Sequence, residues 1–439
     1  MIAAGVLKNR MVKNASWIVA CRIVQSVLAL IISMLTARYL GPSNYGIISY
    51  AASIVAFVVP LMQLGLSNIL VQETIQHPGE EGTIFGTSMV MSLCSAVACM
   101  IGVVAFAFVA NANQTHVVAV CALYSIVLLF QAMEMLQYWF QAKLLSKYAS
   151  IVSLCAYAVV SAYKFFLLLT GKSVYWFAVS NALDVMLICV GLYGMYRKLG
   201  GQKLRFSMET ARRMFARSKY YIVSSLMVTV FVQTDKIMMT LMINETATGY
   251  YSAAVACAGI TNFVIGAIID SARPVILEAK KVAQAEYEKG ITVLYSAIIY
   301  LALAQSLVMT IFARPLITIL YGAEYLPASN ILQVLVWYTT FSYLGGAKDI
   351  WILAEEKQKY LVVLNFAGAV SNVILNLILI PVLGAMGAAI ASLITQFFTN
   401  IVMMFVLKAL RRNGMLMGRA VHPKVILYEI RKITQKERE

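Results

Sequence analysis

The stretch GTSMVMSLCSAVACMIGVVAFAFVA at residues 86–110 contains no charged residue. About 20 apolar residues in a helix span the hydrocarbon core of a bilayer, so this stretch predicts a transmembrane helix. Long uninterrupted runs favour helices over barrel strands, in which polar and apolar residues alternate. With this run, twelve are expected, near 16–40, 45–70, 86–110, 117–140, 148–170, 174–196, 220–243, 248–272, 291–320, 329–352, 361–382 and 386–409. The predicted fold class is an all-α membrane protein with twelve transmembrane helices.

The composition of the whole chain indicates the same environment. Apolar residues make up 61% of the 439 positions and charged residues 12%, whereas soluble domains contain about 45–50% and about 25%. A soluble protein of this composition would expose far more apolar surface than monomers tolerate. The formal net charge is +16, but the basic residues cluster in gaps between apolar runs, as in cytoplasmic loops of membrane proteins. We therefore expect no nucleic-acid partner.

The positions of the basic residues predict the topology. Counted from the N-terminus, the odd-numbered connections contain one basic residue, Lys172, whereas the termini and even-numbered connections contain most of the chain's 35. Loops rich in Lys and Arg remain in the cytoplasm. Both termini are therefore expected to be cytoplasmic.

The longest basic gap, RKLGGQKLRFSMETARRMFARSK at 197–219, divides the runs six and six. The expected organisation is an N-terminal six-helix lobe at 1–196, a basic cytoplasmic linker at 197–219, a C-terminal six-helix lobe at 220–409 and a basic cytoplasmic tail at 410–439. The linker is expected to be either an amphipathic helix on anionic lipid or a solvated loop. The tail is read as a determinant of topology.

An internal repeat supports the six-plus-six division. The segment LGPSNYGIISYAA at 40–52 can be aligned with INETATGYYSAAV at 243–255, and the alignment pairs Gly46 with Gly249. Both segments are short outer turns that open the second helix of a bundle. Repeats of six helices keep the same orientation, so the lobes are expected to be related by a pseudo-two-fold axis along the membrane normal.

Four segments carry a family resemblance. They are TARYLGPSNYGIISYAASI at 36–54, TDKIMMTLMINETATGYYSAA at 234–254, ILYGAEYLPASNILQVL at 319–335 and VLGAMGAAIASLIT at 382–395. In this order they resemble signature segments of the bacterial polysaccharide or O-antigen flippases, within the multidrug/oligosaccharidyl-lipid/polysaccharide (MOP) exporter superfamily. The matches are distributed over nearly the whole chain.

The resemblance implies a function. It implies alternating-access transport of an undecaprenyl-pyrophosphate-linked oligosaccharide, such as the O-antigen repeat unit of lipopolysaccharide, from the cytoplasmic to the periplasmic leaflet of the bacterial inner membrane. The lipid-linked oligosaccharide and anionic membrane lipids are then the expected partners, and polysaccharide-assembly proteins are candidate partners. The chain is expected to be a transporter rather than an enzyme, without a cofactor.

Charged residues inside the predicted helices are the candidate site residues, because a charge at the centre of a bilayer costs at least about 2.5–3.5 kcal/mol. Arg22, Lys164 and Lys236 each lie on a helical face with small hydroxyl residues. Such faces suit a wet cavity that receives phosphate and sugar hydroxyls. The alternative is that each long side chain lies along lipid and extends its charge to the interface.

Two acidic residues complete the predicted translocation site. Asp184 lies near the middle of the sixth run, and Asp235 precedes Lys236. Neighbours on a helix point about 100° apart, so Asp235 and Lys236 do not pair within it. Each acid either pairs with a cation on another helix or carries a coupling proton.

Two other functions, a multidrug exporter and a glycan polymerase or ligase, would be expected to show different sequence features. A cation-coupled multidrug exporter of the same superfamily would be expected to have an acid-dominated interior. A membrane-embedded glycan polymerase or ligase would be expected to have a large outer loop with catalytic residues, whereas every outer loop here is short.

The seven cysteines lie in apolar runs without a CxxC spacing, and the three histidines lie in separate gaps. No catalytic residue and no metal site is therefore predicted.

Overall fold

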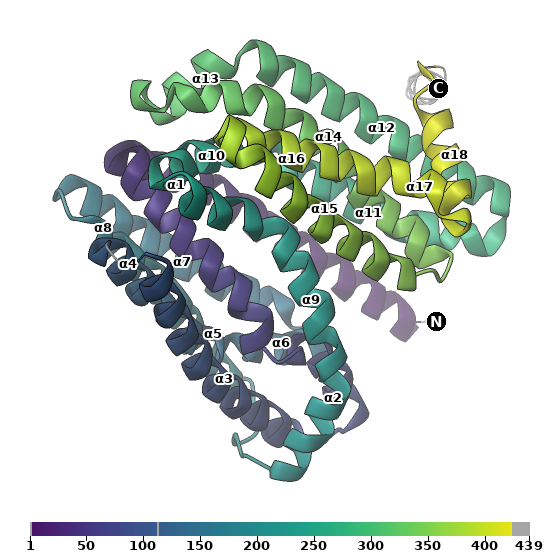
Figure 1. The fold of residues 1–439 in the computed structure, drawn as a ribbon. Coiled ribbons are helices and arrows are strands. Elements are labelled where there is room, and N and C mark those ends of the chain that lie inside the picture. The colour runs from purple at the N-terminus through teal and green to yellow at the C-terminus, as the bar shows by residue number, and fades with distance from the viewer. Residues whose placement is uncertain (1, 112–113, 424–439) are drawn as a thin grey trace. The chain divides into compact units, whose positions relative to one another are not determined.

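The computed structural model describes residues 2–111 and 114–423, with side chains from residue 20 onward, and every regular element in these ranges is a helix (Figure 1). The longer helices are α1 (Ile2–Met62), α3 (Glu81–Ala110), α4 (Thr115–Ser125), α7 (Ser146–Leu169), α8 (Val174–Lys198), α9 (Met208–Met242), α10 (Glu245–Ala258), α11 (Asn262–Val282), α12 (Gln284–Ile311), α14 (Pro327–Ala354), α15 (Lys359–Leu383), α16 (Ala385–Phe397) and α18 (Arg411–Ala420). The shorter ones are α2 (Leu70–Gln76), α5 (Val127–Gln131), α6 (Gln137–Ala142), α13 (Ala313–Tyr321) and α17 (Met403–Val406). The all-α prediction is confirmed.

Most residues of each expected membrane-spanning run lie in helices. Ten segments of the described chain are long and apolar enough to cross a membrane. One of them is the kinked α1, which contains two of the expected runs because Gly41, with φ 71° and ψ 169°, interrupts its helical geometry. Only glycine adopts such a φ at little cost. Helix α14 covers the run expected at 329–352, which completes the set of twelve.

The helix expected over 45–70 ends at Met62, and the helix expected over 117–140 is divided among α4, α5 and α6. Two further predicted helices also end early. The helix expected over 291–320 ends at Ile311, and α13 begins at Ala313. Pro315 explains the break, because it has no backbone N–H to donate to the carbonyl of Ile311. The helix expected over 386–409 passes through a π-helical segment at Phe398–Val402 and ends at Val406, since Leu407 has an extended backbone.

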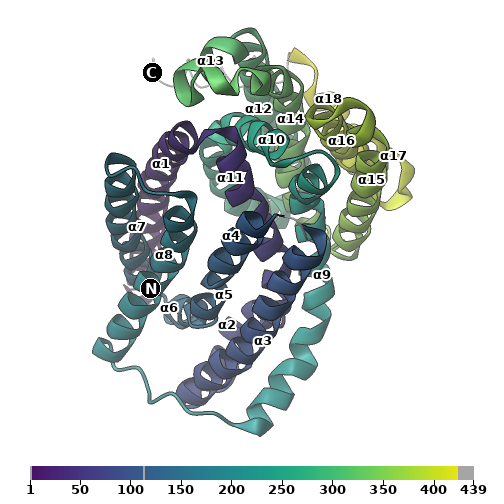
Figure 2. The same ribbon diagram turned by 60° about the vertical axis from the view of Figure 1, so that its left-hand side comes forward.

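The chain forms two compact units, at residues 1–249 and 250–439. In the N-terminal unit, α1 packs along α7 and α9, while α4 and α5, which follow one another along the chain, both pack against α3 (Figure 2). Its buried apolar residues include Tyr50, Leu128 and Phe140. The six-plus-six lobes and their pseudo-two-fold axis stay predictions.

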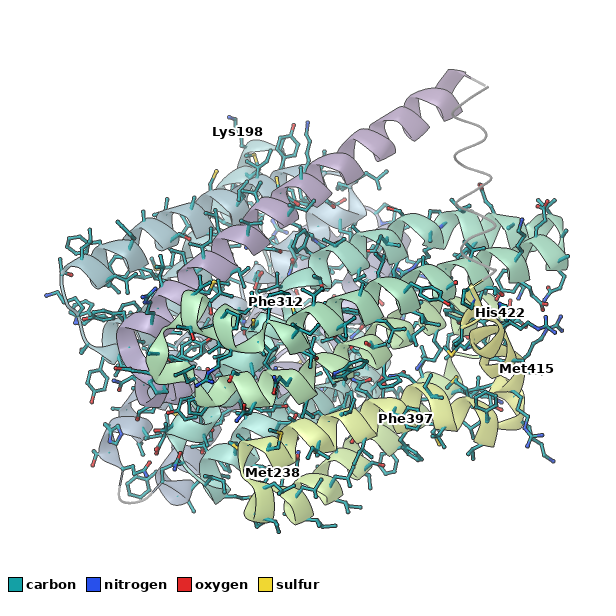
Figure 3. The ribbon with its side chains drawn as sticks, turned by 90° about the horizontal axis from the view of Figure 1, so that it is seen from above. Lys198, Met238, Phe312, Phe397, Met415 and His422 are labelled. Atoms are coloured by element: carbon teal, nitrogen blue, oxygen red, sulfur yellow. The ribbon has the colours of Figure 1, made fainter. Side chains whose placement is uncertain are left out.

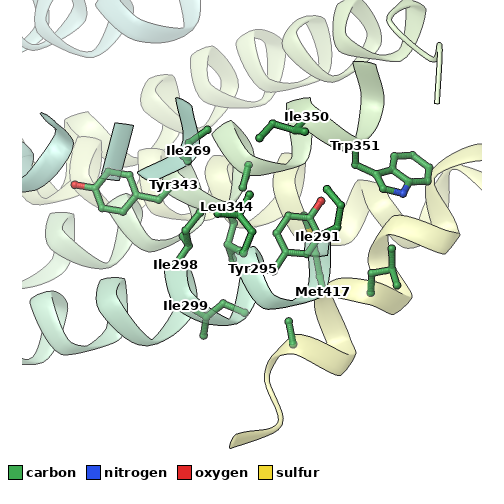
Figure 4. Close-up of a cluster of buried hydrophobic side chains, with 14 of the residues drawn as sticks. Ile269, Ile291, Tyr295, Ile298, Ile299, Tyr343, Leu344, Ile350, Trp351 and Met417 are labelled. Atoms are coloured by element: carbon green, nitrogen blue, oxygen red, sulfur yellow. The ribbon is translucent and has the colours of Figure 1, made fainter. Parts of the chain in front are cut away.

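The C-terminal unit has its own core. Helices α11, α12 and α14 contribute Ile269, Ile298 and Leu344 to one buried cluster, which Met417 of α18 also joins (Figure 4). The hydroxyl of Tyr295 on α12 donates a hydrogen bond of 2.6 Å to Oδ1 of Asn413 on α18. Helix α18 is thereby fixed to the unit as part of the fold.

Large apolar side chains also cover the outer surfaces of the helices. Phe312, Phe397 and Met415 have exposed fractions of 52%, 44% and 53% (Figure 3), and Val109 reaches 78%. Exposed apolar surface on this scale is costly in water. A lipid environment removes that cost, which agrees with the membrane assignment.

The predicted linker contains an irregular segment and the start of a helix. Residues 201–207 form neither helix nor strand and lie along the start of α3, where the N–H of Arg205 donates to the carbonyl of Gly82 at 3.0 Å. A Cβ atom on Gly82 would lie 2.3 Å from the carbonyl oxygen of Lys203, so the approach requires glycine. Residues 208–219 are the first turns of α9. Neither a surface helix on lipid nor a solvated loop describes the whole segment.

The predicted basic tail at 410–439 is described only in part. Arg411, Arg412 and Arg419 belong to α18. The remaining basic residues of the tail, Lys424, Arg431, Lys432, Lys436 and Arg438, lie outside the described residues.

Candidate functional site

A polar cavity of about 430 Å³ lies inside the N-terminal unit. Five helices line it, and all five belong to candidate membrane spans. Its polar lining residues are Ser33, Thr36, Tyr45, Ser49 and Ser53 of α1, Tyr124 of α4, Tyr157 and Lys164 of α7, Asn181 of α8, and Gln233 and Lys236 of α9. Its size, its polar lining and its place within spanning helices make this cavity the candidate site.

The kink in α1 explains how one helix supplies so much of the lining. Ser33 precedes Gly41 and Tyr45 follows it, and their hydroxyl oxygens lie 3.1 Å apart. Both halves of α1 therefore face the same space. Small residues predominate at the positions of α1 that line the cavity.

Lys164 extends from α7 into this cavity. Its Nζ donates a hydrogen bond of 3.2 Å to Oδ1 of Asn181 on α8. The amide nitrogen of Asn181 in turn donates to the carbonyl of Phe177 at 3.3 Å, which fixes the orientation of the amide. The half-buried ammonium group therefore keeps donor capacity for a ligand, because an ammonium group carries three N–H bonds.

Lys236 reaches the same cavity from α9, although its helix is distant in sequence from α7. Asp235, the preceding residue, is buried with an exposed fraction of 6% and is not among the residues that line the cavity. Their charges interact electrostatically, but the side chains point in different directions around the helix. The structure thus brings Lys164 and Lys236 together at one cavity, whereas Asp235 is buried outside the cavity lining.

A second cavity, of about 250 Å³, adjoins the first and shares Tyr124 and Asn181 with it. Asp184 of α8 and Gln131 of α5 line this second space. Oδ1 of Asp184 and Oε1 of Gln131 are both buried without a hydrogen-bond partner in the described structure. Asp184 interacts electrostatically with Lys164. The acid therefore moderates the positive charge of the first cavity.

Arg22 is the predicted site residue that the structure does not bring to the others. Its side chain is exposed on the first half of α1 and lines neither cavity. Ser33 and Thr36, which share its helical face in the sequence, do line the first cavity. The exposed position fits the alternative in which a long cationic side chain reaches an interface.

The sequence reasoning missed Asn181, Gln233 and Tyr124. The sequence spacing could have identified two of them. Asn181 precedes Asp184 by three positions, and Gln233 precedes Lys236 by three positions. Residues three apart on a helix lie on neighbouring positions of one face. Tyr124 had no such signal in its own run.

A buried cation in the C-terminal unit was also missed. Lys348 of α14 has an exposed fraction of 5%, and its Nζ donates to Oδ1 of Asn400 at 3.0 Å. Asn400 lies in the π-helical segment and donates in turn to Oε1 of Gln396. These bonds join α14 to the π-helical segment, so the cluster is interpreted as an interhelical polar contact.

Chemically, the first cavity can bind a ligand that carries both negative charge and hydroxyl groups. Two ammonium groups face it together with amides and hydroxyls, and the described residues contain no group of three or more His, Cys, Asp or Glu that could hold a metal ion. Charge-assisted hydrogen bonds from lysine suit phosphate oxygens, and the neutral groups suit sugar hydroxyls.

Comparison with solved structures shows which proteins share this fold. Lipid II flippase MurJ in an inward closed conformation has a TM-score of 0.71 and 14% identity, over 93% of this chain and 90% of that one. An inward-facing multidrug resistance MATE family transporter of the MOP superfamily has a TM-score of 0.67 and 13% identity, over 90% and 95%. The fold is therefore that of a multi-pass MOP-type transporter.

Sequence comparison then gives the family. The family described as polysaccharide biosynthesis protein matches residues 34–330, more than half of the chain, and the chain belongs to this family. An uncharacterized membrane protein of Methanocaldococcus jannaschii, MJ1068, is 21% identical over 93% of this chain and 86% of its own length. The prediction of a polysaccharide-biosynthesis family is confirmed, and the chain shares its fold with a lipid II flippase and a MOP-superfamily transporter.

Proposed function

We propose that the protein flips an undecaprenyl-pyrophosphate-linked oligosaccharide, such as an O-antigen repeat unit, from the cytoplasmic to the periplasmic leaflet of the bacterial inner membrane. The observation that carries the proposal is the shared cavity of Lys164 and Lys236 inside membrane-spanning helices. The family and the fold support transport linked to polysaccharide biosynthesis.

The two lysines would compensate the charge of the headgroup. A diphosphate carries about two negative charges, which cannot cross hydrocarbon without compensation. Lys164 and Lys236 supply two positive charges at one cavity. We assign binding of the diphosphate to these two lysines. The carboxylates of Asp184 and Asp235 would limit the net positive charge around them.

The sugar would occupy the hydroxyl-rich side of the cavity. The half-buried Ser33 and Ser49 supply hydroxyls from α1, and Tyr124 and Tyr157 add aromatic rings with polar tips. A cavity of about 430 Å³ accommodates a headgroup with its first sugars. The lipid tail then remains outside, in the bilayer. No bond is made or broken in this scheme, so the protein acts as a transporter without a cofactor.

A multidrug exporter is the second candidate, and the smaller cavity favours it. Asp184 is among the residues that line this space, and a carboxylate there suits an organic cation. A MATE family transporter also shares the fold. The position of Lys164 disfavours this candidate. Its positive charge lies close enough to interact with Asp184 and would repel a cationic ligand.

Deletion and complementation test the proposal. A deletion strain is expected to lose surface glycan while lipid-linked repeat units accumulate in the inner leaflet. The intact gene restores export, and a Lys164→Gln, Lys236→Gln double variant at equal membrane abundance does not. Lys172→Gln is the matched control, because Lys172 is exposed in a turn outside the cavity. Normal surface glycan in the deletion strain, together with drug hypersensitivity, would establish the exporter instead.

A further inference from the structure

Asn181 of α8 lines both cavities of the N-terminal unit and also holds Lys164. Its Oδ1 accepts a hydrogen bond of 3.2 Å from Nζ of Lys164, while its amide nitrogen donates to the carbonyl of Phe177. Lys164 itself lines the first cavity. Because the amide is neutral, it fixes the ammonium group without neutralising its charge. The positive charge therefore stays available to an anion in the first cavity.

Asp184 lies one turn further along the same face of α8. Residues three apart on a helix are neighbours, separated by about 4.5 Å along the axis. Asp184 lines the second cavity, and its Oδ1 is buried without a hydrogen-bond partner in the described structure. A buried carboxylate oxygen without a donor is costly, above all inside a membrane-spanning helix. Asp184 thus has acceptor capacity that the described structure does not use.

Lys164 is the donor that can use this capacity. Its charge already interacts electrostatically with Asp184, although Asn181 accepts its hydrogen bond. A lysine has a flexible four-carbon stem, so a change of rotamer can carry Nζ over the about 4.5 Å that separates the two levels of α8. A carboxylate also holds an ammonium group more strongly than a neutral amide does. Lys164 therefore has two alternative partners, one at each cavity.

The two partners have opposite consequences for an anionic ligand. With Nζ at Asn181, the charge of Lys164 faces the ligand. With Nζ at Asp184, the charge is neutralised and the ligand loses one of its two cations. A transporter has to release its substrate as well as bind it, and transport requires binding weak enough to leave. A pair of lysines without such a competitor would hold a diphosphate too long.

We propose that Asp184 is a release residue, which takes the ammonium group of Lys164 as the diphosphate leaves, and that Asn181 is the positioning residue that holds the same group at the first cavity for binding. The inference rests on the proposed function, because it needs an anionic ligand at Lys164. No bond is made or broken in the exchange. Asn181 and Asp184 then act on one lysine in opposite directions.

Binding of farnesyl diphosphate to the full-length protein in detergent tests the two roles by titration calorimetry. Asp184→Asn should lower Kd roughly tenfold, because the ligand no longer competes with a charged acceptor for Lys164. Asn181→Ala should raise Kd roughly threefold or more, because Lys164 loses the partner that holds it at the first cavity. Asp184→Glu keeps the carboxylate and should stay near the wild-type Kd. A variant that is merely misfolded would not bind more tightly.

A double-mutant cycle separates competition for Lys164 from general repulsion of the ligand. In a Lys164→Gln background, Asp184→Asn should change Kd no further, because the lysine for which Asp184 competes is absent. The same tenfold gain in that background would mean that the carboxylate repels the ligand directly, and would overturn the release role. Glu134→Gln is the matched control. Glu134 lies in η2 (Glu134–Leu136), interacts electrostatically with Asp184 and lines neither cavity, so Kd should stay unchanged.

The flipping rate distinguishes release from binding. In proteoliposomes saturated with a fluorescent undecaprenyl-diphosphate oligosaccharide, Asp184→Asn should flip roughly tenfold more slowly than the wild type, although it binds more tightly. An unchanged Kd and rate in Asp184→Asn, with normal binding by the wild type, would overturn the release role and leave the proposed function intact. Absence of binding by the wild type would overturn the diphosphate assignment and the release role together. If Asp184→Asn does not fold, a wild-type Kd in Asn181→Ala would overturn the inference.

Discussion

Replacing either cavity lysine by glutamine should weaken binding of a prenyl-diphosphate oligosaccharide by a measurable factor. Lys164 keeps its Nζ at the cavity through one hydrogen bond of 3.2 Å to Asn181, and Lys236 lines the same space. A hydrogen bond to a charged group contributes about 1.5–3 kcal/mol. This energy corresponds to a rise in Kd of about 10–150-fold. Since both lysines are half-buried, we expect the lower part of that range.

The assay is titration calorimetry on the detergent-solubilised protein with a short-chain prenyl diphosphate that carries the oligosaccharide. Lys164→Arg and Lys236→Arg keep the positive charge and should stay within about threefold of the wild-type Kd, although arginine and lysine differ in shape. Lys172→Gln, an exposed change outside the cavity, serves as the control. Wild-type affinity in both glutamine variants would refute the assignment of the diphosphate to this cavity.

Three further predictions concern topology and stability. A reporter fused after Arg197 should be active only in the cytoplasm, and periplasmic activity would overturn the predicted topology. Glu73→Gln should lower the free energy of unfolding by about 1–3 kcal/mol, because buried Glu73 pairs with Arg213 and Arg217. An unchanged midpoint of thermal unfolding would contradict this prediction. Gly86→Leu should expose residues 201–207 to limited proteolysis, because a Cβ there would lie 2.4 Å from the carbonyl oxygen of Arg205, whereas Gly102→Leu should not.

The fold was predictable because a bilayer imposes a simple rule on sequence. Each spanning segment needs about 20 apolar residues, and runs such as 86–110 satisfy this without reference to the rest of the chain. The ends of helices were less predictable. The breaks after Ile311 and Val406 occur inside apolar sequence, where hydropathy continues but a proline or a local backbone change ends the helix.

The candidate site was predictable in part, for a related reason. A charge inside an apolar run stands out, so Lys164 and Lys236 were found from energetics alone. Which helical face meets a cavity depends on contacts between helices distant in sequence, so Arg22 could not be told apart from the lysines. The same limit hid the packing of residues 201–207 on Gly82, which joins segments over 100 positions apart.

The central claim is that this chain alone moves a lipid-linked oligosaccharide between leaflets through the cavity of Lys164 and Lys236. The most direct test is a flipping assay with the purified protein in proteoliposomes, in which a fluorescent undecaprenyl-diphosphate oligosaccharide is read by its accessibility to an external quencher. We predict fast equilibration between leaflets with the wild type and the Lys172→Gln control, and slow equilibration with the Lys164→Gln, Lys236→Gln double variant. Equal rates for the wild type and the double variant, or a wild-type rate no faster than protein-free liposomes, would contradict the account.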